Sequence, residues 1–259
     1  MKKFYVIGDR VSKSLSPTIF NYWFKKHKIN AKYGFVELNT NNFDRRIKQI
    51  LKDKSVYGLN ITIPFKQKIM KHIDVLDRDS RKINAVNCVS KRSKIKGTNT
   101  DWLGYYKTLP KKKEKNKQVI IIGYGGAALA IHYVLKQKGY KKILIFNRTR
   151  KRINFEHELK YTKKPSTIER YLKGASIIIN TTPKNPLNKK LIGLVNKKTV
   201  LSDIVYSPKD TSFLKNFPNN KKIYGISMLL EQAALCFNIW FGFKPSNDLK
   251  LISNLEKKI

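Results

Sequence analysis

The sequence predicts an α/β protein made of two domains. Strand-like stretches rich in β-branched residues alternate with helical stretches along the whole chain. The length of 259 residues suffices for two domains of ordinary size. After the charged run Lys111–Gln118, a new series begins whose strands are apolar on both faces. Such strands indicate a parallel sheet with helices on both sides.

The elements of the first hundred residues alternate in type. Ser16 suits an N-cap and Pro17 suits the first helical position of one helix, and Asp101 suits the cap of another. In chain order we expect a strand at 4–8, a helix at 16–27, a strand at 33–38, a helix through 43–51, a strand at 56–63, a short helix at 65–73, a hairpin of 85–89 with 95–100, and a helix from 101.

The second series starts beyond Lys111–Gln118, which we interpret as a solvated connection between domains. In chain order we expect a strand at 118–123, a glycine-rich turn and a helix, and strands at 142–147, 176–180 and 199–205. A long apolar helix at 226–243 and a C-terminal helix from about Pro245 complete the chain.

The net charge is +38, from 55 Lys plus Arg against 17 Asp plus Glu. Such a surface attracts nucleic acid, but the basic residues are spread along the chain instead of forming one stripe. Lys, Ile and Asn have A/T-rich codons, so genome composition explains the charge, and we favour this over a nucleic-acid role. The apolar fraction of 41% supports real cores.

Location and metal binding follow from small features. Cys88 and Cys236 form neither a disulfide framework nor a metal-ligand spacing. We therefore expect a protein of the reducing cytoplasm that has no metal site. The N-terminal apolar stretch is too short for a signal peptide, and no run approaches a membrane span.

The stretch NITIPFK places a lysine in an unusual position. Its alternating residues predict a strand, Pro64 stops that strand, and Lys66 follows where a helix would begin. Helix starts favour carboxylates over cations, since the helix dipole is positive there. The position of this ammonium therefore calls for a specific reason.

The stretch IIIGYGGAA predicts a dinucleotide phosphate turn. Gly123-x-Gly125-x-x-Ala128 follows a strand and opens a helix. The first glycine permits a tight turn, and the second lets backbone N–H groups approach a pyrophosphate. In NAD-binding sites an Asp or Glu at the end of the next strand binds the ribose 2′-hydroxyl group. Here Asn147, Arg148 and Thr149 stand at that place. A guanidinium suits a 2′-phosphate, so we predict NADP over NAD.

In this order, SLSP, NITIPFK, AVNC, GTNTDW, GYGGAA, NRT, SDIVYSP and GISMLLEQAA resemble the shikimate dehydrogenase family. The resemblance covers about Phe4 to Gly242. It implies reversible, NADPH-dependent reduction of 3-dehydroshikimate to shikimate. It also implies an N-terminal α/β substrate-binding catalytic domain at 1–101 and 229–259, and a Rossmann-like NADP-binding domain at 102–228. The last helices would return to the first domain, in a monomer or homodimer.

The resemblance also implies roles for particular residues. Lys66 would donate or accept the proton, and Asp101 would pair with it. Substrate contacts would come from Ser14, Ser16, Thr62, Asn87, Tyr206 and Gln232. Cofactor contacts would come from Gly123, Gly125, Gly126, Ala127, Asn147, Arg148, Thr149, Thr181, Thr182, Gly225 and Met228, and Tyr206 would also line the nicotinamide end.

Ordinary structural roles compete with several of these assignments. Ser16 and Asp101 suit plain N-caps, and Met228 suits a core position. The chain also departs from the family pattern: Tyr124 stands where Ala is usual and we expect its ring to point outward, Cys88 replaces a Thr, Ser227 replaces a Gly, Tyr224 replaces an acid, and residues 155–170 look shortened.

Two other functions remain open from the sequence. One is a quinate/shikimate dehydrogenase that uses NAD, against which NRTRKR argues. The other is a basic nucleic-acid-binding protein on a dehydrogenase scaffold, which only the charge supports and which predicts a steep salt dependence of binding.

Overall fold

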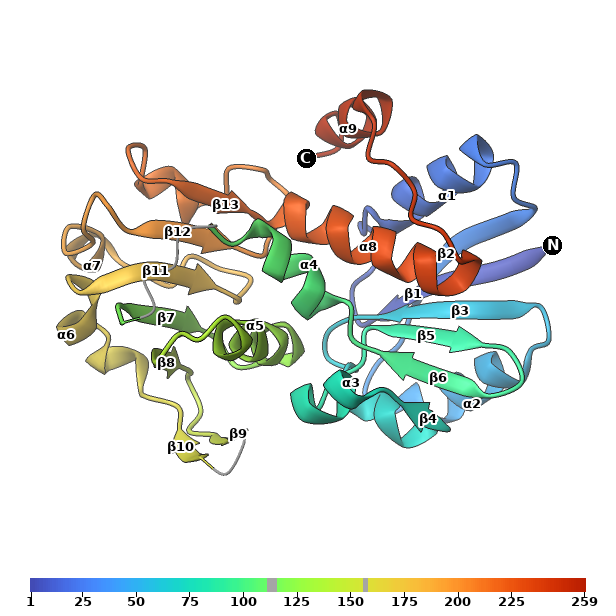
Figure 1. Cartoon of the computed structure of the whole chain (residues 1–259), viewed down its shortest axis with the longest axis horizontal. Helices are drawn as coiled ribbons and strands as arrows, with labels where there is room; N and C mark the ends of the chain where they lie inside the picture. Colours follow the sequence, from blue (N-terminus) through green and yellow to red (C-terminus); the bar gives the residue numbers. More distant parts are fainter. Residues whose placement is uncertain (111–115, 156–157) are drawn as a thin grey trace. The chain divides into compact units, whose positions relative to one another are not determined.

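A computed structural model covers the whole chain and describes residues 1–110, 116–155 and 158–259. The chain forms two compact units (Figure 1). The first unit comprises Met1–Asp101 and Leu230–Lys258, and the second comprises Trp102–Leu229 with Ile259. Both are mixed α and β, which confirms the predicted fold class. Part of the predicted connection, residues 111–115, lies outside the described residues.

The first unit contains a mixed sheet in the order β2-β1-β3-β5-β6-β4. Parallel pairing joins β1 to β2 and to β3, and antiparallel pairing joins β3, β5 and β6. The strands are β1 (Lys2–Gly8), β2 (Ala31–Glu37), β3 (Val56–Ile61), β4 (Val75–Leu76), β5 (Cys88–Lys91) and β6 (Ile95–Thr98). The helices are α1 (Ser16–Lys26), α2 (Phe43–Lys52), the 3₁₀ helix η1 (Lys68–His72), α3 (Arg78–Ile83) and α9 (Leu249–Glu256).

Alternate residues of the first sheet enter two different cores. Ile7, Leu59 and Ile61 pack with Phe43 and Ile47 of α2. Phe4 points to the other side, where it meets aromatic rings of α1 and of α8 (Gly225–Phe241). The part of α8 that belongs to the first unit thus contributes Trp240, which also donates from its ring N–H to the Val89 carbonyl oxygen at 3.0 Å. The C-terminal segment therefore completes the core of the first unit.

The second unit contains a parallel sheet in the order β13-β12-β11-β7-β8. The strands are β7 (Gln118–Ile122), β8 (Lys142–Phe146), β11 (Ala175–Asn180), β12 (Val200–Asp203) and β13 (Lys222–Tyr224). On one face α4 (Asp101–Thr108) and α5 (Gly126–Gln137) supply Tyr105, Ile131 and Val134 to a core with β7 and β11. On the other face Leu172 and Leu214 pack with Ile120 and Leu201. Helices on both sides of a parallel sheet were predicted and are confirmed.

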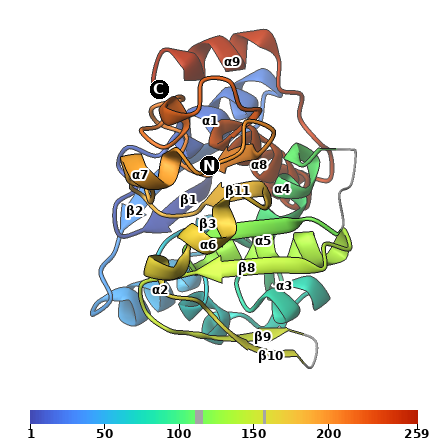
Figure 2. The ribbon, with the colours of Figure 1, turned by 90° about the vertical axis from the view of Figure 1, so that its left-hand side faces the viewer.

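The connection between β8 and β11 differs from a plain crossover helix. It contains β9 (Arg152–Phe155) and β10 (Glu158–Tyr161), which form an antiparallel hairpin apart from the sheet (Figure 2). The 3₁₀ helix η2 (Pro165–Thr167) and the short α6 (Glu169–Leu172) follow. In the stretch at 155–170, which looked shortened in sequence, residues 156–157 lie outside the described residues. The remaining small elements are α7 (Lys189–Ile192) and the 3₁₀ helix η3 (Leu214–Asn216).

Several predicted boundaries were wrong. The strand expected to reach Ile63 ends at Ile61, and the helix expected at 65–73 is the shorter η1. The last helix begins at Leu249 instead of near Pro245, because the Asp248 carboxylate caps it by accepting from the Leu251 N–H. These ends depend on individual capping contacts, which periodicity does not reveal.

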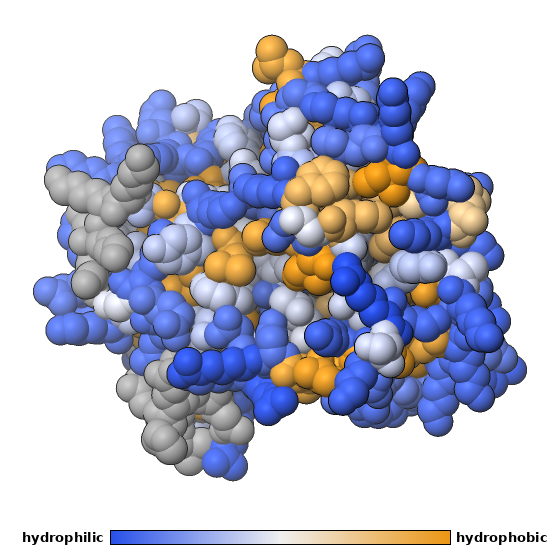
Figure 3. Space-filling model, turned by 45° about the vertical axis from the view of Figure 1, so that its right-hand side comes forward, coloured by the Kyte–Doolittle hydropathy of each residue, from blue (hydrophilic) through white to orange (hydrophobic). Residues whose placement is uncertain are grey.

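Hydrophilic residues are distributed over most of the face shown in Figure 3, with smaller apolar areas between them. Within the described ranges, no helix has the length and apolar character needed to cross a membrane. The same ranges contain no group of three or more His, Cys, Asp or Glu side chains arranged to hold a metal ion.

Candidate active site

In the first unit, two of the predicted substrate residues follow the carboxyl ends of the parallel strands β1 and β3. Gly8 ends β1, and a Cβ atom at this position would collide with the side chains of Thr62 and Val11. Thr62 follows β3, and Ser14 donates its N–H to the Val11 carbonyl oxygen at 2.9 Å. Thr62 and the segment leading to Ser14 therefore lie close together at one edge of the sheet.

The segment between β1 and α1 is held by a carboxylate. Glu37 Oε1 accepts from the N–H groups of Val11 and Ser12 at 2.9 and 2.8 Å. The pKa of this carboxyl group is lowered most by the hydrogen bond from the Ser12 backbone, and further by bonds from the Ser12 side chain and the Val11 backbone. The ionised carboxylate thus fixes the residues that precede Ser14 and Ser16.

The prediction that Ser16 is the N-cap of α1 was wrong. The cap position is Leu15, and Ser16 is the first helical residue, with its side chain buried. The Ser14 hydroxyl oxygen accepts from the Ser16 N–H at 3.3 Å. Ser14 thus provides an acceptor for one N–H group at the start of this helix. The side chain of Ser16 therefore does not serve as the N-cap of α1.

Lys66 lies between the end of β3 and the start of η1, outside any helix. Its carbonyl oxygen accepts from the Val86 N–H at 2.8 Å, and the Phe65 N–H donates to the Thr62 carbonyl oxygen at 2.9 Å. Phe65 is fully buried and stacks on Phe43. This anchored turn fixes the backbone of Lys66, so the direction of its side chain is restricted.

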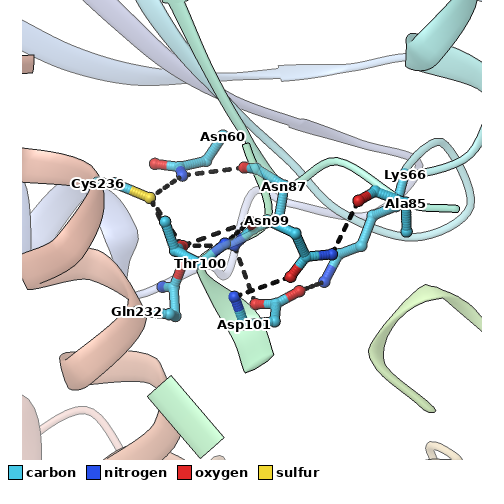
Figure 4. A network of polar contacts seen from close by, with 9 residues as sticks. All are labelled: Asn60, Lys66, Ala85, Asn87, Asn99, Thr100, Asp101, Gln232 and Cys236. Carbon is cyan, nitrogen blue, oxygen red and sulfur yellow. Dashed lines mark hydrogen bonds and ion pairs between the residues drawn. The ribbon is translucent and has the colours of Figure 1, made fainter. Parts of the chain in front are cut away.

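The Lys66 ammonium meets the Asp101 carboxylate, as the family resemblance implied. Lys66 Nζ and Asp101 Oδ2 are 2.5 Å apart, and the side chains are 13% and 6% exposed. Asn87 Nδ2 donates to Asp101 Oδ1 at 3.0 Å and also faces Gln232 Oε1 at 3.1 Å (Figure 4). Four of the predicted residues therefore form one network in the first unit.

The expectation that Asp101 caps its helix was wrong in detail. Asp101 is already the first residue of α4, and its own N–H donates to Asn99 Oδ1 at 3.1 Å. The hydrogen bonds described for its carboxylate come from the side chains of Lys66 and Asn87. The Asp101 carboxylate is therefore the ion-pair partner of Lys66 and not the cap of α4.

A second layer of polar groups, which sequence reasoning missed, supports Asn87. Asn87 Oδ1 accepts from the Thr100 N–H at 2.6 Å, and Thr100 Oγ1 lies 3.1 Å from Cys236 Sγ. Asn60 Nδ2 is 3.0 Å from the same sulfur (Figure 4). The Tyr33 hydroxyl donates to Asn60 Oδ1 at 2.7 Å. The stretches NITIPFK and GTNTDW contained Asn60 and Thr100, but only the fold shows their contacts.

The glycine turn of the second unit has the predicted backbone conformation. Gly123 has φ of +101°, and a Cβ atom there would collide with Thr181 and Thr182. Gly125 is the N-cap of α5, and a Cβ atom at Gly125 would meet no atom within 4 Å. Gly126 and Ala127 form the first turn of that helix, which carries no acidic residue. An open space before a helix N-terminus suits a phosphate group.

The prediction that Tyr124 points outward was wrong. Its ring is partly buried against the core formed by α5 and the sheet, and burial raises the pKa of its phenol. The bulky residue is accommodated because its side chain packs on this apolar cluster.

At the end of β8 the predicted ribose-phosphate residues lie at the surface. Arg148 and Thr149 are exposed, and Asn147 Nδ2 donates to the Thr149 carbonyl oxygen at 2.8 Å. The Asn147 N–H donates to the Lys163 carbonyl oxygen at 3.0 Å. Asn147 thus shapes the turn that presents Arg148 to solvent.

The remaining predicted cofactor residues have different environments. Thr181 Oγ1 donates to the Ile122 carbonyl oxygen at 2.8 Å, and Thr182 Oγ1 lies 2.7 Å from Asn180 Oδ1. Tyr206 is half-buried in the loop after β12, and Gly225 is buried at the start of α8. Met228 is buried within the core with β7 and β11, which matches its alternative interpretation as a core residue.

A glycine turn shaped for a dinucleotide and a largely buried Lys–Asp pair are features of a nicotinamide-dependent oxidoreductase. Residues 6–89 match the family model described as the shikimate dehydrogenase substrate binding domain. Residues 107–211 match the model described as shikimate / quinate 5-dehydrogenase.

Individual relatives extend this match over the whole chain. The NADP(+) shikimate dehydrogenase of Pelagibacter ubique is 36% identical over 98% of this chain and 99% of its own. The solved shikimate dehydrogenase 1 of Peptoclostridium difficile is 26% identical, with a TM-score of 0.88 over 99% and 98% of the two chains. A shikimate dehydrogenase solved in complex with NADP+ is 28% identical, with a TM-score of 0.82 over 100% of this chain and 96% of that one. The chain belongs to the shikimate dehydrogenase family.

Proposed function

We propose that this chain reduces 3-dehydroshikimate to shikimate reversibly, with Lys66 as the proton donor and Asp101 as its partner. At the coarser level the chain is an oxidoreductase, an NADP-dependent shikimate dehydrogenase, as its relatives are named. The observation that carries the finer proposal is the contact of 2.5 Å between Lys66 Nζ and Asp101 Oδ2 in a largely buried setting.

The ion pair gives the lysine both a proton and a direction. Reduction of a ketone places negative charge on its oxygen, and an ammonium group can stabilise that charge and then donate a proton to it. Asp101 accepts from Lys66 and is itself fixed by Asn87, so the ammonium keeps one orientation. In the reverse direction Lys66 accepts the proton of the substrate hydroxyl.

Other residues of the first unit would bind the substrate. Ser14 and Ser16 lie at the start of α1, where N–H groups and the helix dipole favour a carboxylate. Thr62, Asn87 and Gln232 carry hydroxyl and amide groups suited to the substrate hydroxyls. Tyr206, which belongs to the second unit, would be a further substrate contact. We accordingly assign 1–101 and 229–259 as the catalytic domain.

The second unit would hold NADP, and we assign 102–228 as the cofactor domain. The open space at Gly125, beside Gly123 and Gly126, fits the pyrophosphate. Arg148, with Asn147 and Thr149, would bind the 2′-phosphate, and Thr181, Thr182, Gly225 and Met228 would lie toward the nicotinamide. When bound, NADPH supplies the hydride that the ketone carbon receives.

We further expect a cytoplasmic protein that acts as a monomer or homodimer. Its two cysteines are free and buried, which suits a reducing compartment.

The test is the absorbance of reduced nicotinamide after mixing purified protein with shikimate and either NADP+ or NAD+. Rapid reduction of NADP+ with little reduction of NAD+ is the expected result. Equal use of both cofactors would contradict the role of Arg148. Reduction by quinate but not by shikimate would favour the quinate enzyme, and inactive folded protein that binds DNA or RNA with a steep salt dependence would favour the nucleic-acid function.

A further inference from the structure

Two buried polar side chains lie next to each other at the carboxyl edge of the second sheet. Asn180 ends β11 and Asp203 ends β12, and they are register partners on these neighbouring parallel strands. They are 1% and 2% exposed. The carboxyl edge of a parallel sheet is where ligands bind in folds of this type, so polar groups at this edge act on the binding loops.

Asn180 holds the loop that follows β11. Its Oδ1 accepts from the Thr182 N–H at 3.0 Å and from the Thr182 hydroxyl at 2.7 Å. Its Nδ2 faces the carbonyl oxygens of Thr182 and Lys184 at 3.1 and 3.3 Å. One amide side chain therefore takes the place of a backbone partner for much of the loop at 181–184.

Asp203 holds the loop that follows β12. Its Oδ1 accepts from the Val205 N–H at 3.0 Å, and its Oδ2 accepts from the Thr211 hydroxyl at 2.7 Å. Asn180 Nδ2 lies 3.3 Å from both of its oxygens, which connects the two loops. These partners are neutral, and burial raises the pKa of this carboxyl group. Keeping a carboxyl group in such a place is costly, which indicates a specific role for it.

Both loops touch the backbone segments assigned to the cofactor. A Cβ atom on Gly123 would collide with Thr181, so the first loop lies directly against the glycine turn. A Cβ atom on Gly225 would come within 2.5 Å of the Ile204 carbonyl oxygen and 2.6 Å of that of Val205. The second loop therefore lies directly against the start of α8. A shift of either loop would disturb these contacts.

We propose that Asn180 and Asp203 are positioning residues that fix the loops at 181–184 and 204–211 in the arrangement that receives NADP. This inference rests on the proposed function, because it takes Thr181, Thr182 and Tyr206 as parts of the same reaction site. Neither Asn180 nor Asp203 needs to touch the cofactor. Their contribution is to hold the loops in one arrangement before the cofactor arrives.

The test compares NADPH affinity, measured by nucleotide fluorescence, in the full-length protein and three variants. Asp203→Asn keeps the shape but removes the charged acceptor, and Thr211→Val removes one bond to Asp203. Thr199→Val is the matched control: Thr199 is 1% exposed and donates to the Ala175 carbonyl oxygen at 2.8 Å, at the opposite ends of β11 and β12. We expect the dissociation constant of NADPH to rise roughly ten-fold in Asp203→Asn, less in Thr211→Val, and not in the control.

Hydrogen exchange of the free protein provides a readout that is independent of catalysis. The Val205 amide should exchange faster in Asp203→Asn, because its hydrogen-bond acceptor is weakened. The Thr182 amide should exchange faster in Asn180→Ser, because its acceptor is the Asn180 side chain. Unchanged affinity and exchange in Asp203→Asn would overturn the proposal, as would an equal loss of affinity in the Thr199→Val control. If the wild-type protein binds NADPH but does not oxidise shikimate, the proposed reaction fails, while the comparison of affinities still decides the loop roles.

Discussion

Replacing Lys66 by methionine removes the ammonium and keeps much of the side-chain volume. Loss of a positioned proton donor lowers turnover by about 10²–10⁴-fold. The substitution also leaves Asp101 Oδ2 without its ion-pair partner, although Asn87 still donates to the other oxygen. Removing one partner of a buried ion pair costs about 3–5 kcal/mol of folding free energy, which is less than the typical stability of a folded domain. The Lys66→Met variant should therefore fold and yet turn over very slowly.

The assay is the initial rate of NADP+ reduction at varied shikimate, together with a thermal unfolding curve. We expect kcat to fall within that range while the KM for shikimate changes far less. Lys68→Met is the matched control, because Lys68 lies two residues further on and its ammonium donates to the Thr40 carbonyl oxygen at 3.2 Å. This control should retain wild-type turnover.

The kinetic pattern separates a catalytic role of Lys66 from a binding role. A large increase in KM with unchanged kcat would reduce Lys66 to a binding contact. Equal losses of activity in Lys66→Met and Lys68→Met would show that the assay responds to the lost charge and not to the position. Either result would refute the assignment of the proton to Lys66.

Two further predictions concern the cofactor and the acid stability. Arg148→Ser should raise the KM for NADP+ by about 10–100-fold, because a charged hydrogen-bond donor to phosphate is lost. It should leave the KM for NAD+ nearly unchanged. Lys142→Ser at the other end of β8 should have neither effect, and a parallel rise for both cofactors would contradict the assignment. The Asp248 carboxylate accepts from Lys26, the Leu251 N–H and Tyr22, and these bonds lower its pKa from 3.8 to about 2. A lowered pKa stabilises the fold above pH 3.8 and ceases to do so as the pH falls toward 2. The difference in thermal midpoint between wild type and Asp248→Asn should therefore shrink between these pH values, and a constant difference would argue against the linkage.

Much of the scaffold could be predicted from the sequence, because periodicity and glycine spacing report local requirements. The run QVIIIGYGGAA predicted a strand, a tight turn and a helix, and the structure has β7, Gly123 with positive φ, and α5. The pairing of Lys66 with Asp101 was also predicted, but only through the family resemblance. The two residues are 35 positions apart in the sequence, and no local rule brings them together.

The errors share a physical cause: the local sequence allowed two placements of a side chain, and contacts distant in the sequence decided between them. Ser14 and Ser16 can both serve the start of α1, and tertiary packing decided that Ser16 is helical and buried. Tyr124 could have faced solvent, but an apolar surface within its reach favoured burial. Asn180 and Asp203 were missed because each ends its strand in a different part of the sequence. Their contact exists only once β11 and β12 pair in register.

The central claim is that the ammonium group at position 66 transfers the proton. The most direct measurement is the rate of NADP+ reduction by shikimate for Lys66→Cys, before and after alkylation with 2-bromoethylamine, which rebuilds a primary ammonium at nearly the same distance. The native cysteines are fully buried, so the new thiol should react selectively, and equally treated wild-type protein controls for damage. The account predicts an inactive variant that regains turnover after alkylation. A variant that is active from the start, or one that stays inactive after verified alkylation, would contradict it.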